Sequence, residues 1–240
     1  MKNNLAINGG PKTLNKSFGW PIFDDKEIKA ISEITRSGNW GNPDCAGIVE
    51  EFEKDFAAYC GTKYALTCVN GSVALRLALI ASGVKPGDEV ITPPYTFIAT
   101  ASIVLEANCV PVFVDIEPDT YNLDPVEIEK AITNKTKAII PVHFAGLSCN
   151  MEAIMKKLGS IGHAGCFSFQ SSKNLTSGEG GMAITNDDQL FKMMNSLRNV
   201  GRIEGGQWYE HHYLGCNYRI TQLQVALLKE QFKRLHGQTK

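Results

Sequence analysis

The sequence predicts an α/β fold in which a doubly wound parallel sheet is covered by helices. From residue 64 onward, short apolar segments alternate with helical ones, and turns rich in Gly, Pro and Asp separate them. The apolar segments show little polar alternation, which is typical of strands buried on both faces of a parallel sheet. At 240 residues the chain is long enough to bury a sizeable core.

Residues 1–60 are expected to form an N-terminal helical segment. A first helix should begin at the capping residues Asp24 and Asp25 and end near Gly38. A second helix should stop at Gly61, because glycine accepts the left-handed conformation that follows many helices. Its apolar stripe consists of Val49, Phe52, Phe56 and Tyr59.

Residues 61–240 are expected to form one larger domain of alternating strands and helices. The expected strands are 64–69, 89–92, 110–116, 137–144, an apolar strand from Cys166, and 182–185. The expected helices are one that follows Ser72 and ends at Gly83, then 97–105, 125–132 and about 221–235.

Composition excludes several classes of protein. The chain has 24 Lys+Arg against 25 Asp+Glu, so its net charge of −1 gives no electrostatic reason to expect nucleic acid or an anionic membrane as partner. It has no apolar run of the roughly 18–20 residues that a membrane span needs, and no secretory signal at its start. Its seven cysteines are scattered without a C-x-x-C pair, which favours free thiols over disulfides or a metal site. A cytoplasmic protein is expected.

Two polar segments interrupt this pattern and are candidates for chemistry. Asn70-Gly71-Ser72 lies between a strand and a helix, where backbone N–H groups and a hydroxyl can bind phosphate, although the same residues also suit a plain turn and cap. The second segment runs from Cys166 to Gly181 and holds one lysine, Lys173, among small and hydroxyl side chains. A desolvated lysine there would suit Schiff-base chemistry, whereas a solvated loop lysine is the alternative.

Taken together, the ordered motifs resemble the DegT/DnrJ/EryC1/StrS family of pyridoxal-phosphate (PLP) aminotransferases, which act on sugars and cyclitols. The resemblance spans nearly the whole chain. Its motifs are 5–11, Trp20-Pro21, 37–41, 70–75, 93–100, 112–115, 141–146, the lysine segment and 215–219.

The resemblance implies a role for individual residues. Lys173 matches the lysine that forms a Schiff base with PLP and moves protons during the reaction. Phe97 matches the aromatic residue stacked against the pyridine ring, with a core aromatic as the alternative. Asn217 matches an asparagine that reaches toward the cofactor of a neighbouring subunit, which implies a homodimer.

The cofactor phosphate has its own matching residues. Gly71, Ser72 and Val73 match the turn that holds it, and Ser168 matches a hydroxyl nearby. No metal site is implied.

The chain departs from the family pattern at one internal place. Family members have a buried strand with an Asp-Ala-Ala-Gln type motif whose acid pairs with the pyridinium nitrogen, but here the segment 151–157 passes directly to 158–162. About two dozen residues, one strand with its connections, are expected to be missing. His163 stands where an acidic residue is usual and cannot supply that negative charge, so the electron sink should be weakened.

The expected fold is therefore the large domain of a fold type I PLP transferase, with a mostly parallel sheet that lacks one strand. The small C-terminal domain of the family is expected to be absent after residue 240.

Three functions are compatible with these residues. The first is a PLP-dependent transfer of an amino group from glutamate or glutamine to a keto-sugar or keto-cyclitol. It would serve amino-sugar, cell-surface polysaccharide or secondary-metabolite biosynthesis. The second is a catalytically impaired remnant of the family, or pseudoenzyme. The third, a PLP-dependent sugar dehydratase, is disfavoured by Lys173, because those enzymes replace the lysine by histidine.

Overall fold

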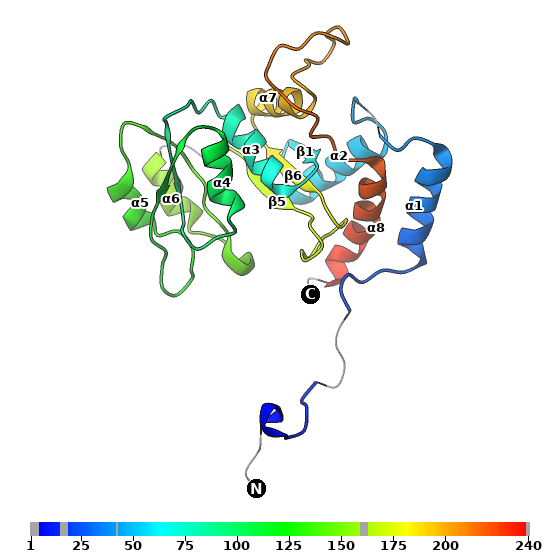
Figure 1. The fold of residues 1–240 in the computed structure, drawn as a ribbon, viewed down its shortest axis with the longest axis horizontal. Coiled ribbons are helices and arrows are strands. Elements are labelled where there is room, and N and C mark those ends of the chain that lie inside the picture. Colours follow the sequence, from blue (N-terminus) through cyan, green and yellow to red (C-terminus); the bar gives the residue numbers. More distant parts are fainter. Residues whose placement is uncertain (1–4, 15–18, 42, 159–162, 239–240) are drawn as a thin grey trace.

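The structure is a computed structural model that describes residues 5–14, 19–41, 43–158 and 163–238. Two short sheets and their covering helices form the body, and the N-terminal residues extend away from it (Figure 1). The strands are β1 (Tyr64–Cys68), β2 (Glu89–Thr92), β3 (Val110–Phe113), β4 (Thr136–Ile139), β5 (Gly165–Ser168) and β6 (Gly181–Thr185). The α-helices are α1 (Asp25–Ser37), α2 (Ile48–Cys60), α3 (Gly71–Ala81), α4 (Ala99–Glu106), α5 (Pro125–Ala131), α6 (Met151–Leu158), α7 (Asp188–Arg198) and α8 (Gln222–Gln238). Two 3-10 turns, η1 (Ala6–Asn8) and η2 (Phe144–Gly146), complete the elements.

The helix boundaries that depend on local signals agree with the sequence. Asp24 caps α1 by accepting from Lys26 N, and Glu27 completes a capping box with it. Gly61 follows α2 with a φ of 65°, in the left-handed region. Strand β4 is shorter than the predicted 137–144, since Pro141 has no N–H to continue a ladder.

The six strands form two separate three-stranded sheets, in the orders β1-β6-β5 and β3-β2-β4. In the second sheet both pairings are parallel. In the first sheet both are antiparallel, because β6 runs against β1 and β5. Within the expected mostly parallel arrangement, β6 is thus an antiparallel strand: the Gly-rich loop of residues 169–180 returns the chain in the opposite direction, which hydrophobic patterning does not reveal.

The break between the sheets falls where the sequence predicted a missing strand. β4 ends one sheet, β5 ends the other, and α6 lies between them in the chain. The two strands do not pair with each other in the described residues. The absence of one strand predicted from the sequence is thus visible as an interrupted sheet.

Helix α3 joins the two sheets. Its Leu75 and Leu79 belong to a cluster with Val90 of β2 and Ile103 of α4. On its other side, Ala74 and Leu77 pack with Leu66 of β1 and with the β6 strand. In Figure 1 α3 accordingly lies between the group of α4, α5 and α6 and the group of β1, β5 and β6.

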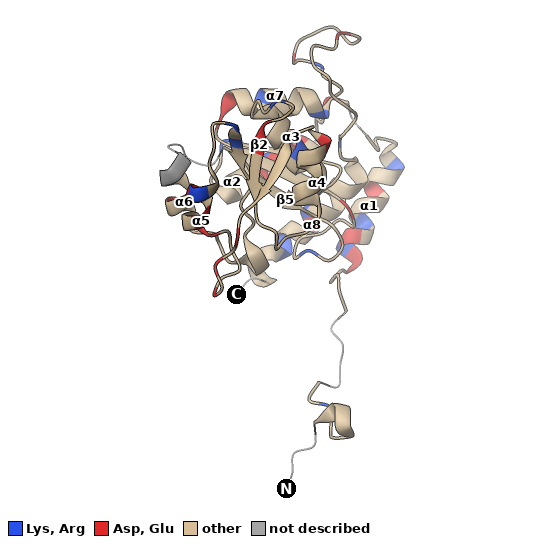
Figure 2. Ribbon diagram, turned by 60° about the vertical axis from the view of Figure 1, so that its left-hand side comes forward, with Lys and Arg blue, Asp and Glu red and all other residues tan. Residues whose placement is uncertain are grey.

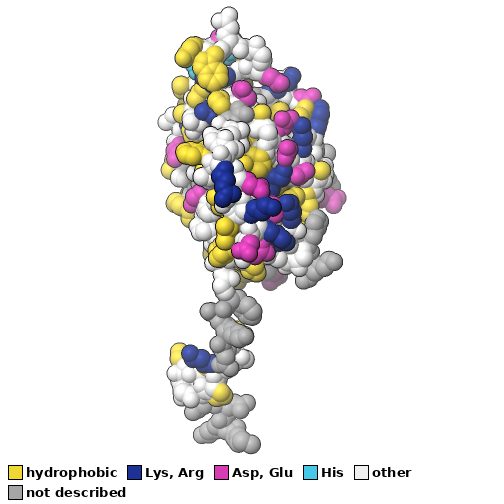
Figure 3. Space-filling model, turned by 90° about the vertical axis from the view of Figure 1, so that its right-hand side faces the viewer, with side chains coloured by type: hydrophobic (Ala, Val, Ile, Leu, Met, Phe, Trp, Pro, Cys, Tyr) yellow, Lys and Arg dark blue, Asp and Glu magenta, His cyan; other side chains and the backbone are white. Residues whose placement is uncertain are grey.

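The opposite face of the β1-β6-β5 sheet is covered by α2 and α8. Its core is an aromatic cluster in which Phe52 and Phe56 of α2 contact Phe169 after β5 and Phe232 of α8 at centroid distances of 5.8–6.2 Å. Helix α1 packs on the outside of α8. On the face toward α1, positive and negative side chains are interspersed (Figure 3), and along the ribbon of α1 acidic and basic residues alternate (Figure 2).

A buried ion pair connects α7 to α2 through β1. Arg198 donates to Glu53 and to the backbone oxygen of Thr67, and Glu53 also accepts from the Thr67 backbone and hydroxyl. Burial disfavours the charge on Arg198, but Glu53 outweighs it and raises the arginine's pKa. Removing one partner would leave the other as an uncompensated buried charge.

All seven cysteines are free. Cys216 is exposed, whereas Cys45, Cys68, Cys109 and Cys149 are buried. Burial raises the pKa of the Cys68 thiol to about 12. None of the described helices is long and apolar enough to cross a membrane.

We predict that Arg198→Met lowers the free energy of unfolding by about 3–5 kcal/mol, because Glu53 is left buried and unpaired. Urea unfolding followed by circular dichroism measures it. Lys54→Ala is the matched control: it removes the exposed partner of Glu50 and should cost less than about 1 kcal/mol. Equal losses in the two variants would contradict the role given to the buried pair.

Candidate functional site

The N-terminus of α3 presents unpaired hydrogen-bond donors. Asn70 caps the helix, and its side chain accepts from Val73 N at 2.9 Å. The backbone N–H groups of Gly71 and Ser72 have no partner within the helix, as is usual in a first turn, and none elsewhere in the described residues. The Ser72 hydroxyl also makes no hydrogen bond there. Two amides and one hydroxyl therefore point out of a helix N-terminus, an arrangement that suits an anion.

This helix end sits directly on the carboxyl end of β5. A Cβ added to Gly71 would lie 2.7 Å from Ser168 Cβ, and one added to Gly181 would lie 2.2 Å from the Asn70 oxygen. Both positions thus need glycine: the Gly71 backbone approaches Ser168, and the Gly181 backbone approaches the backbone of Asn70 and Gly71. Ser168 accepts only a long bond of 3.3 Å from Gln170 N, so its hydroxyl remains available to a ligand. The structure brings Gly71, Ser72, Val73 and Ser168 together at one edge of the sheet.

Lys173 lies in the loop between β5 and β6. The loop is anchored inside by Thr176, whose hydroxyl donates to Phe169 O, and outside by Trp20, whose indole N–H donates to Ser171 O at 2.9 Å. Lys173 itself is exposed, and its amine makes no hydrogen bond or ion pair with the described residues. The observed surroundings are therefore those of a solvated loop lysine, the reading that composition alone favours, and the described residues of this chain do not provide a desolvated environment.

Phe97 and Asn217 make no hydrogen bond to the group formed by Gly71, Ser72, Val73 and Ser168 in the described part of the chain. Phe97 follows β2 and is 74% exposed, so the alternative of a core aromatic is wrong. Asn217 is exposed and bridges to Asn199, next to a cavity of about 300 Å³ that Arg219 also lines. No hydrogen bond among the described residues connects Phe97, Lys173 or Asn217 to the α3 N-terminus.

Two residues that the sequence placed in motifs, but not among the predicted cofactor-binding residues, also shape the site. Asn70 fixes the first turn of α3, and its signal was available, because Asn before an apolar helix is a preferred N-cap. Trp20 holds the lysine loop from a position about 150 residues earlier. No residue near Trp20 in the sequence indicates its contact with Ser171, although Trp20-Pro21 is one of the family motifs.

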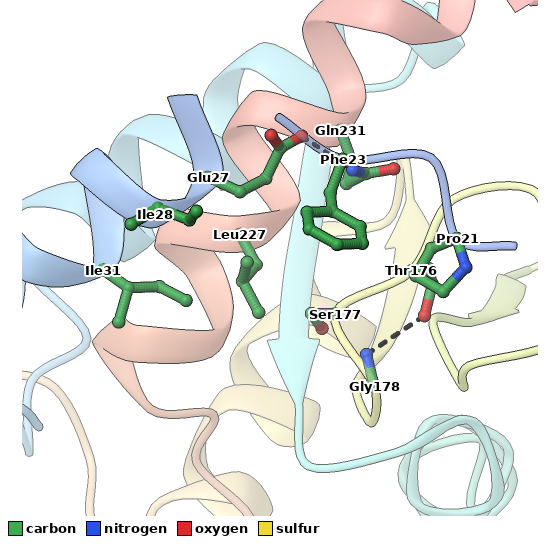
Figure 4. Close-up of a pocket in the computed structure, with 10 residues that line it drawn as sticks. All are labelled: Pro21, Phe23, Glu27, Ile28, Ile31, Thr176, Ser177, Gly178, Leu227 and Gln231. Atoms are coloured by element: carbon green, nitrogen blue, oxygen red, sulfur yellow. Dashed lines mark hydrogen bonds between the residues drawn. The ribbon is translucent and has the colours of Figure 1, made fainter. Parts of the chain in front are cut away.

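A second cavity, of about 210 Å³, lies elsewhere between α1, α8 and the end of the lysine loop (Figure 4). Apolar side chains line it, among them Phe23, Ile28 and Leu227, and Glu27 accepts from Gln231 at its edge. It contains none of the predicted site residues. The candidate site is thus the α3–β5 edge and not this cavity.

Comparison with known proteins identifies the family of the chain. The family model described as the DegT/DnrJ/EryC1/StrS aminotransferase family matches residues 21–157 and 155–240. The GDP-perosamine synthase of Caulobacter vibrioides is 43% identical over 211 residues, which cover 78% of this chain and 57% of that protein. A putative L-glutamine:3-amino-2,3-dideoxy-scyllo-inosose aminotransferase of Streptoalloteichus tenebrarius is 37% identical over 270 residues, covering 100% of this chain and 65% of its own.

Solved structures of aminotransferase-family proteins also resemble this chain. The chain superposes on 3-amino-5-hydroxybenzoic acid (AHBA) synthase with a TM-score of 0.87 and 33% identity, over 93% of this chain and 65% of that one. It superposes on ntda from Bacillus subtilis, solved with bound cofactor PMP, with a TM-score of 0.85 and 28% identity, over 93% and 57%. The chain thus spans between 57% and 65% of the length of these four proteins.

The comparisons also locate the internal departure. The family match divides at residues 155–157, at the end of α6. The alignment with the Streptoalloteichus relative has 270 positions against 240 residues here, so about 30 (270 minus 240) have no counterpart in this chain. With the motifs, the fold and these matches in agreement, the chain belongs to the DegT/DnrJ/EryC1/StrS aminotransferase family.

Proposed function

We propose that this chain is the cofactor-binding part of a PLP-dependent aminotransferase. Its reaction would move an amino group from glutamate or glutamine onto a keto-sugar or keto-cyclitol, in amino-sugar, cell-surface polysaccharide or secondary-metabolite biosynthesis. The observation that carries the proposal is the pair of unpaired amides at the α3 N-terminus beside Ser168, in a chain of this family. The names of the relatives, a perosamine synthase and an inosose aminotransferase, support the substrate class.

The residues present fit the phosphate of PLP. Gly71 and Ser72 offer backbone donors, Val73 completes the turn, and the hydroxyls of Ser72 and Ser168 add two more donors. The positive end of the α3 dipole favours a dianionic group there. When bound, PLP supplies the electron sink that lets an amino group be taken from a donor and passed to an acceptor.

The other predicted residues would act on the cofactor's reactive end. Lys173 carries a free primary amine on a loop held by Trp20, so it can attach the cofactor covalently and later carry protons. Phe97 offers an exposed flat face for the pyridine ring. Because Lys173 and Phe97 are both exposed, the cofactor itself would have to exclude water from them.

A homodimer in the cytoplasm is part of the proposal. Asn217 would reach toward the partner subunit, and the neighbouring segment exposes large apolar side chains, with Tyr209 at 86% and Leu214 at 98%. Exposed apolar groups of this size favour burial against another surface. Seven free thiols are in keeping with a reducing compartment.

Neither alternative function gains support. Lys173 stands where the dehydratases would have histidine, and the relatives compared above are named as synthases or aminotransferases.

The first test of the function asks whether Lys173 forms a covalent bond with PLP. Protein mixed with PLP and then borohydride should carry a reduced cofactor adduct on Lys173, detected by peptide mass spectrometry. The adduct should disappear in Lys173→Ala and persist in Lys192→Ala, which removes an exposed lysine of α7. In a separate sample without borohydride, the PLP-loaded protein should accept the amino group of glutamine or glutamate and release the corresponding 2-oxo acid, a half-reaction followed by absorbance. Equal labelling of both lysines, or no labelling, would sink the proposal.

The second test concerns the phosphate end. Ser72→Ala should weaken PLP binding about tenfold, since one charge-assisted hydrogen bond is lost, and Gly71→Ala should weaken it further by displacing α3 from Ser168. Ser82→Ala is the control, because its hydroxyl donates to Leu79 O at the far end of the same helix. Fluorescence titration measures the affinities, with inorganic phosphate as competitor. Unchanged affinity in Ser72→Ala and Gly71→Ala would argue against this site.

A further inference from the structure

The cavity between α1, α8 and the end of the lysine loop joins three parts of the chain that are distant in the sequence. Residues 21–23 close one of its sides (Figure 4). Its volume is about 210 Å³. An engineered apolar cavity of about 150 Å³ holds benzene, so this one has room for a ring system of the size of indole.

The walls of this cavity are mainly apolar. They include the side chains of Pro21, Phe23, Ile28, Ile31 and Leu227. Phe23 and Ile28 are 65% and 56% exposed, so the cavity opens to the surface and a small molecule can enter it. The Phe23 ring gives one wall a flat face, which suits another aromatic ring. Covering these groups with an apolar ligand is favourable, because their surface is removed from water.

Glu27 is the charged residue among those that line the cavity, and it is already paired. Its carboxylate is buried and accepts from Arg234 at 2.8 Å. It also accepts from Gln231 at 2.7 Å and from the Asp24 amide at 2.9 Å. A charged ligand would lose its hydration here without gaining a free partner of opposite charge. The lining therefore favours a neutral ligand.

The hydroxyl groups that line the cavity have already used their hydrogens. The Thr176 hydroxyl donates to Phe169 O, and the Ser177 hydroxyl donates to Glu179 O. The Gly178 amide in turn donates to the Thr176 hydroxyl. A ligand that carries only acceptors would find no donor among these groups.

The Gln231 side chain, in contrast, has an acceptor without a partner. Its Nε2 donates to Glu27 and to Ile22 O, both at 2.7 Å, which fixes the orientation of the amide. Gln231 is 4% exposed, and its Oε1 is buried without a hydrogen bond among the described residues. In Figure 4 this oxygen points away from Glu27, toward the side of Pro21. A buried acceptor of this kind is costly, so a ligand that donates to it gains affinity.

An aromatic ligand suits this acceptor better than water does. The oxygen is covered in the free protein, and Phe23 lies near it, because Ile22 O accepts from the same amide. The Phe23 ring is largely exposed, so it can turn and admit a ligand. An ordered water needs about two to four polar partners, whereas the walls around Gln231 are mainly apolar. Replacing a poorly held water by an apolar group is favourable.

We propose that this cavity binds a small, neutral aromatic molecule with one hydrogen-bond donor, between phenol and indole in size. The O–H or N–H group of the ligand donates to Gln231 Oε1, and its ring lies against Phe23 and the aliphatic side chains of α1 and α8. This binding is independent of the proposed cofactor chemistry.

Indole tests the proposal on the full chain, and indene, which has CH₂ in place of the N–H, is its matched partner. Saturation-transfer NMR and calorimetry should show saturable binding of indole with a Kd of about 1 mM or lower. Nuclear Overhauser contacts should join the indole protons to the methyl groups of Ile28, Ile31 and Leu227. A cavity that holds only water would give no saturable binding, and this result would overturn the proposal, as would contacts with other methyl groups alone.

Three variants assign the binding to this cavity. Leu227→Trp fills it and should weaken indole binding more than tenfold, whereas Leu105→Trp, at an exposed leucine of α4, should leave the affinity unchanged. Gln231→Met removes the acceptor and should weaken indole binding about tenfold relative to indene. Because both ligands are compared on the same variant, a general loss of stability does not affect this ratio. Equal effects of the two Trp variants, or an unchanged ratio in Gln231→Met, would overturn the proposal.

Discussion

The packing of α3 across two separate sheets is the interaction on which the rest of the structure depends. One side of the helix is buried with β2 and α4, and the other with β1 and β6. No ladder of backbone hydrogen bonds joins the two sheets in the described residues. Side-chain packing against α3 therefore holds the two sheets together, as backbone hydrogen bonds do in a continuous sheet. The same packing presses the first turn of α3 onto β5, where Gly71 and Gly181 permit backbone contact. Architecture and candidate site therefore rest on one helix.

Local features could be predicted from the sequence because their causes are local. The capping box at Asp24, the left-handed Gly61 and the exact extent of β2 each follow from residues a few positions apart. The Asn70-Gly71-Ser72 turn is of the same kind. The missing strand was also predictable, although only by comparison with a family pattern, because an absent segment leaves no trace in periodicity.

Other features depend on long-range contacts and escaped prediction. The direction of β6 follows from the path of the loop after Phe169, not from its own apolar residues. The exposure of Lys173 depends on which elements surround the loop, and no spacing near the lysine encodes that. Phe97 is apolar like a core residue, and only the family resemblance assigned it to the cofactor; it is 74% exposed. The Lys173 amine and the Phe97 ring suit the binding of a cofactor, and both are exposed, so a cofactor or a partner chain can cover them.

Residue-resolved amide hydrogen exchange, recorded with and without PLP, tests the central claim most directly. The account predicts slow exchange in β2 and β6, and fast exchange at the outward amides of β4 and β5. It also predicts that PLP slows exchange at Gly71 and Ser72 without slowing it at Ile139. A continuous pattern of protection from β2 through β5 would contradict the interrupted sheet. A lack of protection at Gly71 and Ser72 with PLP bound would contradict the phosphate site.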